Sequence, residues 1–297
     1  MLKNQLKTIL LLGSLSALLV GVGSLVAPGM LGLFAVLAVA MNVGAYFFSD
    51  RLVLRMHHAA EVSPAEAPTL HAMVGELAVA AGIPKPRVFL IPEEQPNAFA
   101  TGRNPANGVV AVTEGLVRLL DERELRGVLA HELAHIRNRD ILLATVAATM
   151  AGILSYLGQA LTFGAFFGGG RDDNESAHGG LLAAIVAPLA AMLVQMAISR
   201  SREYLADETG ARLSKDPAAL ARALVKLERG VALVPAHASP GTASLFIVNP
   251  FGALERLSRL FSTHPSTDER VRRLLAMAES TDRVRQTSWR PSLLGES

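Results

Sequence analysis

The stretch LRGVLAHELAHIRNRD, residues 125–140, contains the pattern His131-Glu132-x-x-His135 in a segment with helical spacing of apolar residues. Four residues are close to one helical turn, so the two histidines lie one above the other on one face. This spacing lets two imidazoles bind one zinc ion, while Glu132 reaches a water on the metal as general base. The alternative is an accidental match in a helix rich in Ala, Leu, Arg and Glu, so the motif needs a third ligand.

The same stretch predicts where its helix begins and which face it buries. Asp121 and Glu124 form a capping-box-like pair at the start of the helix. At about 100° per residue, four apolar residues fall on one arc that would face a core: Leu125, Leu129, Leu133 and Ile136.

The composition is too apolar for an ordinary soluble domain. Of 297 residues, 51% are hydrophobic and only 18% are charged, which favours a membrane protein with a soluble part. The chain has no cysteine, so any metal must be bound by His, Asp or Glu. The net charge of +2 is far below that of a nucleic-acid-binding protein. The G-x-x-x-x-G-K-[ST] pattern is missing as well, so we expect neither nucleic acid nor nucleotide as a partner.

Residues 1–50 predict an N-terminal transmembrane hairpin that places the chain in a lipid bilayer. Two uncharged runs, about 8–26 and 30–48, are each long enough to span a membrane. A cleaved signal peptide is disfavoured because the first run is too long and a second span follows at once. Lysines before the first run and arginines after the second place both flanks in the cytoplasm.

Residues 141–198 predict a second hydrophobic hairpin. Its two uncharged runs cover about residues 141–168 and 181–198, and an acidic loop separates them. We interpret both runs as membrane helices because they are near or above spanning length. A pair of long buried core helices remains the alternative.

Residues 51–140 and 199–297 are interpreted as the two parts of one cytoplasmic, zincin-like α+β catalytic domain. A helix is predicted to start at Ser63 and to end at Gly82. Three strands are predicted to form a small sheet that leads directly into the H-E-x-x-H helix: residues 87–91, 97–102 and 108–113. An edge strand of this sheet could hold an extended peptide by strand addition, although a plain structural hairpin explains the same pattern.

Glu203 and Asp207 supply carboxylates for the site. They are four residues apart on a predicted helix, so they share one face. Glu203 then fits a zinc ligand, and Asp207 fits a carboxylate that holds a ligand histidine in its tautomer. The alternative is a solvated helix whose carboxylates pair with arginines. Farther on, residues 231–250 are interpreted as a loop over the site, and His264 precedes a terminal helix.

Four separated pieces of the chain resemble one known family. They occur in the family's order, and paired hydrophobic runs accompany them: NAFATG at 97–102, HELAHIRNRD at 131–140, SRSREYLAD at 199–207 and STHPSTDERVRRL at 262–274. On these pieces the chain resembles the HtpX-type membrane-embedded zinc metalloproteases, gluzincins related to the CAAX prenyl endopeptidases. The resemblance covers nearly the whole chain.

This resemblance implies a site built from five of the residues above. His131, His135 and Glu203 would bind one Zn²⁺ per chain. Glu132 would be the catalytic base, and Asp207 would be the carboxylate behind a ligand histidine. The motif and the resemblance thus assign the same chemistry to the H-E-x-x-H helix.

The resemblance also implies a setting and a function. His264 and Asn97 would lie near the active site and help to stabilise the transition state or bind substrate. The protein would be a multi-pass protein of a bacterial plasma (inner) membrane with its site facing the cytoplasm. Without a nucleotide site, it would cleave misfolded or damaged membrane proteins independently of ATP, in stress response and protein quality control. The alternative is a catalytically silent or regulatory membrane scaffold that retains a zinc site, although no ligand or base is missing.

Overall fold

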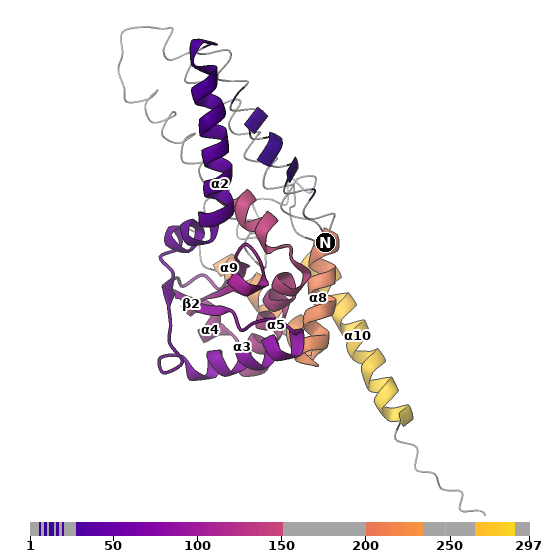
Figure 1. Cartoon of the computed structure of the whole chain (residues 1–297). Coiled ribbons are helices and arrows are strands. Elements are labelled where there is room, and N and C mark those ends of the chain that lie inside the picture. The colour runs from indigo at the N-terminus through magenta and orange to yellow at the C-terminus, as the bar shows by residue number, and fades with distance from the viewer. Residues whose placement is uncertain are drawn as a thin grey trace, which may run out of the picture.

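A computed structural model of the chain describes residues 28–150, 200–233, 247 and 265–288, together with isolated positions between 6 and 20. Within these ranges the protein is mostly helical and contains one small mixed sheet. The predicted class, mainly α with a small β-sheet, is therefore confirmed. Figure 1 shows a long helix, α2, standing away from a group of helices packed around the sheet.

The sheet has four strands in the order β1-β2-β4-β3. Their bounds are Ala60–Glu61 for β1, Arg87–Ile91 for β2, Ala98–Thr101 for β3 and Val109–Thr113 for β4. β2 and β4 are parallel, whereas β1 pairs antiparallel with β2 and β3 pairs antiparallel with β4. The three predicted strands are confirmed. β1 is too short to show an alternating pattern in the sequence.

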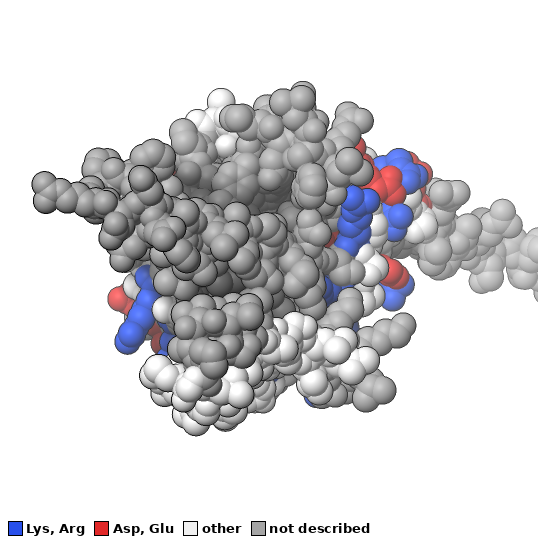
Figure 2. Space-filling view, turned by 90° about the horizontal axis from the view of Figure 1, so that it is seen from above, with Lys and Arg blue, Asp and Glu red and all other residues white. Residues whose placement is uncertain are grey.

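Helix α2, Leu31–Met56, is the one described helix that is long and apolar enough to cross a membrane. It begins one residue after the start of the predicted second span, residues 30–48, and continues past its end. Most of its large apolar side chains are exposed rather than packed in a core. Figure 2 looks down on the end from which α2 projects, and the described surface there is mostly uncharged, with charged residues toward the sides.

The other three predicted spans lie largely outside the described residues. Of the first span, only isolated helical positions are described. Of the second hairpin, the described part is the apolar helix Ile141–Met150, which lies near the base of α2 in Figure 1. Residues 151–199 are outside the described ranges. The four-helix arrangement therefore stays a prediction.

Helix α3, Pro68–Ala81, begins later than its predicted start at Ser63. Ser63 and Glu66 do form reciprocal bonds of the kind that cap a helix: the Ser63 N–H donates to Glu66 Oε2 at 2.7 Å and the Glu66 N–H to Ser63 Oγ at 3.4 Å. These bonds close only a turn. Pro68 disfavours helical backbone at the residue before it, so the helix cannot begin until the proline itself. The predicted end is confirmed, since Gly82 has a left-handed conformation with φ 66°.

A short helix separates the sheet from the H-E-x-x-H helix. We expect from the sequence that the sheet leads directly into that helix, and this expectation is wrong. Helix α4, Glu114–Leu119, follows β4 at once. It begins there because the Thr113 hydroxyl accepts the Leu116 N–H at 3.1 Å and so caps its first turn.

Helix α5, Glu122–Asn138, carries the H-E-x-x-H motif. The predicted capping box is confirmed, because the Glu124 N–H donates to Asp121 Oδ1 at 2.9 Å and the Asp121 N–H to Glu124 Oε2 at 3.1 Å. The four residues of the predicted apolar arc are buried. Helices α8, Arg200–Ser214, and α9, Pro217–Leu233, pack against α5, and α10, Thr267–Ser288, packs against both of them.

Candidate metal centre

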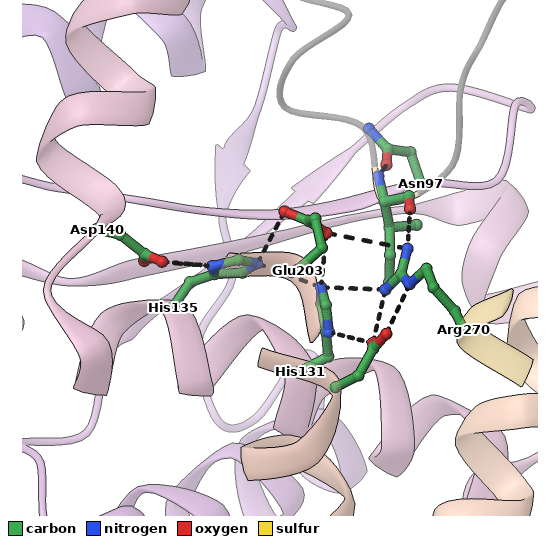
Figure 3. Close-up of polar contacts among 8 residues, drawn as sticks. Asn97, His131, His135, Asp140, Glu203 and Arg270 are labelled. Carbon is green, nitrogen blue, oxygen red and sulfur yellow. Dashed lines mark hydrogen bonds and ion pairs between the residues drawn. The ribbon is translucent and has the colours of Figure 1, made fainter. Parts of the chain in front are cut away.

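Two helices bring the three predicted ligands together. His131 and His135 on α5 place their Nε2 atoms 3.2 Å apart. Glu203 on α8 places Oε2 3.7 Å from His131 Nε2 and Oε1 3.8 Å from His135 Nε2. One ligand atom from each residue lies within 4.8 Å of the others. Figure 3 shows the two imidazoles and the Glu203 carboxylate directed at one another.

Each histidine also has a carboxylate at its other ring nitrogen. Asp207 Oδ1 lies 2.9 Å from His131 Nδ1, and the Asp140 carboxylate lies 3.2 Å from His135 Nδ1. A carboxylate at Nδ1 holds the proton there and leaves the Nε2 lone pair for a cation. Two neutral imidazoles and one carboxylate are a donor set that zinc accepts well. The residues present therefore fit the metal that the motif predicts.

Asp140 is a member of the site that the sequence analysis did not assign. It lies beyond the end of α5, five residues after His135, so it does not share a helix face with that histidine. Arg139 has a left-handed conformation with φ 58°, and this bend returns the chain toward the helix. In the sequence Asp140 is one of several polar residues at the end of the piece HELAHIRNRD, and helical spacing does not link it to His135.

Close packing at a glycine lets α8 reach α5. A Cβ atom on Gly210 would lie 2.8 Å from the N and Cα atoms of His131. Real Cβ atoms do not come this close to backbone, so the two helices can adopt this separation only with glycine there. Asp207 and Glu203 lie one and two turns before Gly210 on the same helix. The close approach therefore brings both carboxylates within reach of the histidines.

Arg270 is the second residue that the sequence analysis did not assign. It projects from α10, and only 2% of it is exposed. Its Nε and Nη2 atoms donate to Asp207 Oδ2 and Oδ1 at 2.8 and 2.7 Å. Burial would raise the pKa of Asp207, but Arg270 and His131 hold it well below its usual range. Asp207 is thus an ionised carboxylate between the guanidinium of Arg270 and the imidazole of His131.

Glu132 lies beside the three ligands and is buried. Burial raises the pKa of its carboxyl group, although the neighbouring His131 and His135 act in the opposite direction. The backbone N–H of Ala100 in β3 lies close enough to this carboxylate to lower its pKa as well. Strand β3 thus lies beside Glu132, and the location of Glu132 agrees with the predicted role of a base.

The two remaining predicted site residues have different outcomes. Asn97 is buried just before β3, and its Oδ1 accepts the Ile247 N–H at 3.2 Å. It lies on the Arg270 side of the centre in Figure 3. His264 lies outside the described residues, so its role stays a prediction. Of the predicted loop 231–250, residues 231–233 complete α9 and Ile247 is buried near the centre.

We predict that zinc binding to this centre depends on pH. Burial alone would lower the pKa of His135, but Asp140, Glu203 and Glu132 raise it to about 10. His135 therefore holds a proton at neutral pH when no cation is bound, and metal binding requires the loss of that proton. We expect zinc affinity to fall about tenfold for each unit that pH is lowered between about 8 and 6. Competition with a chelator of known proton affinity measures this, and an affinity constant over that range would contradict it.

Comparisons with known proteins show to which family the chain belongs. The model of Peptidase family M48 matches residues 64–278. A protease HtpX homolog of Syntrophobacter fumaroxidans is 54% identical, with 92% of this chain and 99% of that protein covered. One of Pelotomaculum thermopropionicum is 51% identical, with 93% and 99% covered. Among solved structures, S. mikatae Ste24p has a TM-score of 0.49 and 19% identity, with 92% of this chain and 65% of that chain covered.

The family match includes every described residue of the centre, from Asn97 to Arg270. Two sequences that are more than half identical over almost their full length share a fold and a family. The resemblance inferred from the four sequence pieces is therefore confirmed. The chain belongs to peptidase family M48 and is a metallopeptidase, a hydrolase that acts on peptide bonds.

Proposed function

We propose that this protein is an integral membrane zinc endopeptidase that hydrolyses misfolded or damaged membrane proteins at the cytoplasmic face without ATP. One observation carries the proposal. The Nε2 atoms of His131 and His135 and the Glu203 carboxylate converge beside the buried carboxylate of Glu132. The same chain carries a long apolar helix, α2, that could enter a membrane.

The three ligands would leave one coordination position for water, as catalytic rather than structural zinc sites do. When bound there, zinc supplies polarisation of the scissile carbonyl and acidification of the attacking water. Asp207 and Asp140 hold the two imidazoles in the tautomer that directs Nε2 at the centre. These contacts orient the ligands before any metal binds.

Glu132 is the residue that would move the proton. Burial raises the pKa of its carboxyl group, and a base with a raised pKa accepts a proton more readily at neutral pH. It would take the proton from the attacking water and deliver it to the leaving amine.

Strand β3 is our candidate for holding the substrate. In the described part of the chain it pairs with β4 alone, so it is an edge strand. Asn97 accepts the Thr113 N–H, and the alternation of an antiparallel ladder then directs the backbone groups of Ala98 and Ala100 away from β4. Because the Ala100 N–H meets Glu132, a peptide added along this edge would lie beside the base. A purely structural hairpin remains the alternative.

The charges of α2 support a cytoplasmic site. Arg51 and Arg55 lie near the C-terminal end of the helix and are exposed. The sheet and the helices that carry the metal centre, α5 and α8, lie at this same end of α2 in Figure 1. Arginines next to a membrane span favour the cytoplasmic side. The metal centre would then face the cytoplasm close to the membrane.

We predict metal-dependent cleavage of unfolded polypeptide without ATP. The detergent-purified full chain should cleave a labelled, permanently unfolded polypeptide, lose activity to a chelator, and regain it with one equivalent of zinc. A compact form of the same polypeptide, held by a disulfide, should be cleaved at least about a hundredfold more slowly. Only its locally unfolded fraction can enter the site, and this fraction is small. Equal cleavage of both forms would refute the requirement for unfolded substrate. Zinc binding without any cleavage would instead favour the scaffold alternative.

A further inference from the structure

The peptide backbone of Ile247 is held at both ends next to the metal centre. Its N–H donates to Asn97 Oδ1 at 3.2 Å, and its carbonyl oxygen accepts from Arg270 Nη1 at 2.7 Å. All three residues are buried, with exposed fractions of 2% for Asn97, 4% for Ile247 and 2% for Arg270. Figure 3 shows Asn97 and Arg270 on the same side of the centre.

Asn97 is the fixed end of this arrangement. Its own N–H donates to the Thr113 hydroxyl at 2.9 Å, and its carbonyl accepts the Thr113 N–H at 2.9 Å. The backbone of Asn97 is thereby anchored to β4. Because the Ile247 N–H is a donor, the amide atom that meets it must be the oxygen of Asn97. The side chain therefore acts here as an acceptor.

Arg270 is the end that reaches the metal centre. While Nη1 holds the Ile247 carbonyl, Nε and Nη2 hold both oxygens of Asp207. A guanidinium is a rigid planar fork, so fixing Nη1 also fixes the plane in which the other two nitrogens meet the carboxylate. Asp207 Oδ1 in turn lies 2.9 Å from Nδ1 of His131. The orientation of a ligand histidine thus depends on a backbone carbonyl contributed by residue 247.

We propose that Asn97 and Arg270 are positioning residues that work as one unit on the backbone of Ile247, and we name this unit the Ile247 clamp. The clamp joins the start of β3, α10 and α8, and holds Asp207 in the orientation that directs His131 Nε2 at the metal. The proposal rests on the proposed zinc peptidase function. It assigns Asn97 a role different from contact with the substrate or the transition state.

Asn97 acts as a hydrogen-bond acceptor in the clamp but would act as a donor if its amide bound the substrate. Two substitutions separate these roles. Asn97→Asp keeps the acceptor oxygen and loses the amide donor, whereas Asn97→Ala loses both. If the clamp is correct, Asn97→Ala lowers kcat about tenfold, the usual effect of one lost buried hydrogen bond, with little change in KM. Asn97→Asp restores kcat to within about twofold of wild type. If instead the amide donates to substrate, Asn97→Asp is as impaired as Asn97→Ala, and the clamp is overturned.

Arg270 provides a second test whose readout does not need activity. Arg270→Met should weaken zinc binding about 10- to 100-fold, as the loss of a group behind a ligand usually does. Arg272→Met is the matched control, because Arg272 lies on the same helix, is exposed and pairs with Glu269. It should leave zinc affinity unchanged. Chelator competition measures both variants.

A double substitution tests whether the two residues act as one unit. Asn97→Ala should weaken zinc binding in wild type but have no further effect in the Arg270→Met background, because the clamp is already broken there. Independent, multiplying effects would overturn the proposal. If Arg270→Met does not fold, the zinc affinities of Asn97→Asp and Asn97→Ala decide the question alone, with Asn97→Asp expected to match wild type. These affinities remain measurable if the wild-type protein cleaves nothing, so failure of the clamp is distinguishable from failure of the proposed function.

Discussion

Replacement of Glu132 with glutamine is expected to abolish peptide hydrolysis while the metal stays bound. Glutamine has the same shape, but it cannot take a proton from water. General-base catalysis contributes about 10²- to 10⁴-fold to a rate, so we expect activity to fall by about a thousandfold. Because Glu132 is assigned as base rather than ligand, zinc content should remain one per chain. Cleavage of an unfolded polypeptide and metal analysis of the same preparation measure both.

Glu122→Gln is the matched control for this substitution. Glu122 lies in the first turn of the same helix and is exposed, so its variant should retain full activity. Equal cleavage by wild type and Glu132→Gln would assign the activity to another site or to a contaminant. Loss of zinc together with activity would show that Glu132 is a ligand or a structural residue, and the proposed site would be wrong.

Replacement of Gly210 with alanine is expected to move α8, which carries Glu203 and Asp207, away from α5, which carries the two histidines. The new methyl group would lie 2.8 Å from backbone atoms of His131, and backbone cannot move aside as a flexible side chain can. Overpacking costs about 1–3 kcal/mol, partly offset by the gain of about 0.5–1 kcal/mol for alanine over glycine within a helix. We expect a net loss of about 1–2 kcal/mol in unfolding free energy. The displacement of Glu203 and Asp207 should weaken zinc binding about 10- to 100-fold.

Gly75→Ala controls for the helix propensity of alanine. Gly75 lies within α3, and its Cβ would meet only the Lys85 side chain, at 3.9 Å. This variant should be as stable as wild type or more stable, with unchanged zinc affinity. Denaturant unfolding and chelator competition on both variants provide the comparison. If Gly210→Ala lost stability but kept its zinc affinity, the separation of α5 and α8 would not determine the ligand geometry.

The parts of the fold that are visible in the sequence are those set by neighbouring residues. The capping box of Asp121 and Glu124 and the left-handed end at Gly82 depend on a few consecutive residues, and both are confirmed. The predicted start of α3 at Ser63 is wrong because two local signals compete. The restriction that Pro68 imposes on the residue before it overrides the helix-capping bonds between Ser63 and Glu66. Local reasoning succeeds where one rule applies and fails where two rules conflict.

The residues of the site also differ in whether local spacing predicts them. His131, Glu132 and His135 share one helix, so their spacing alone predicts a zinc motif, and the pairing of Glu203 with Asp207 repeats that logic on a second helix. Helical spacing does not predict the contact of Asp140 with His135, because the left-handed conformation of Arg139 turns the chain back toward the helix. A bend of this kind changes which side chains meet and leaves no periodic pattern.

By itself, the sequence determined the chemistry of this protein: which groups can bind a metal, which carboxylate can act as base, and which helix is apolar enough to enter a membrane. These properties follow from residue type and helical period. Only the tertiary structure decided how the chemistry is held in place. Arg270 meets Asp207 across 63 positions of chain, and Ile247 meets Asn97 across 150. Such pairs depend on the path of the whole chain through its core, and helix period carries no information about that path.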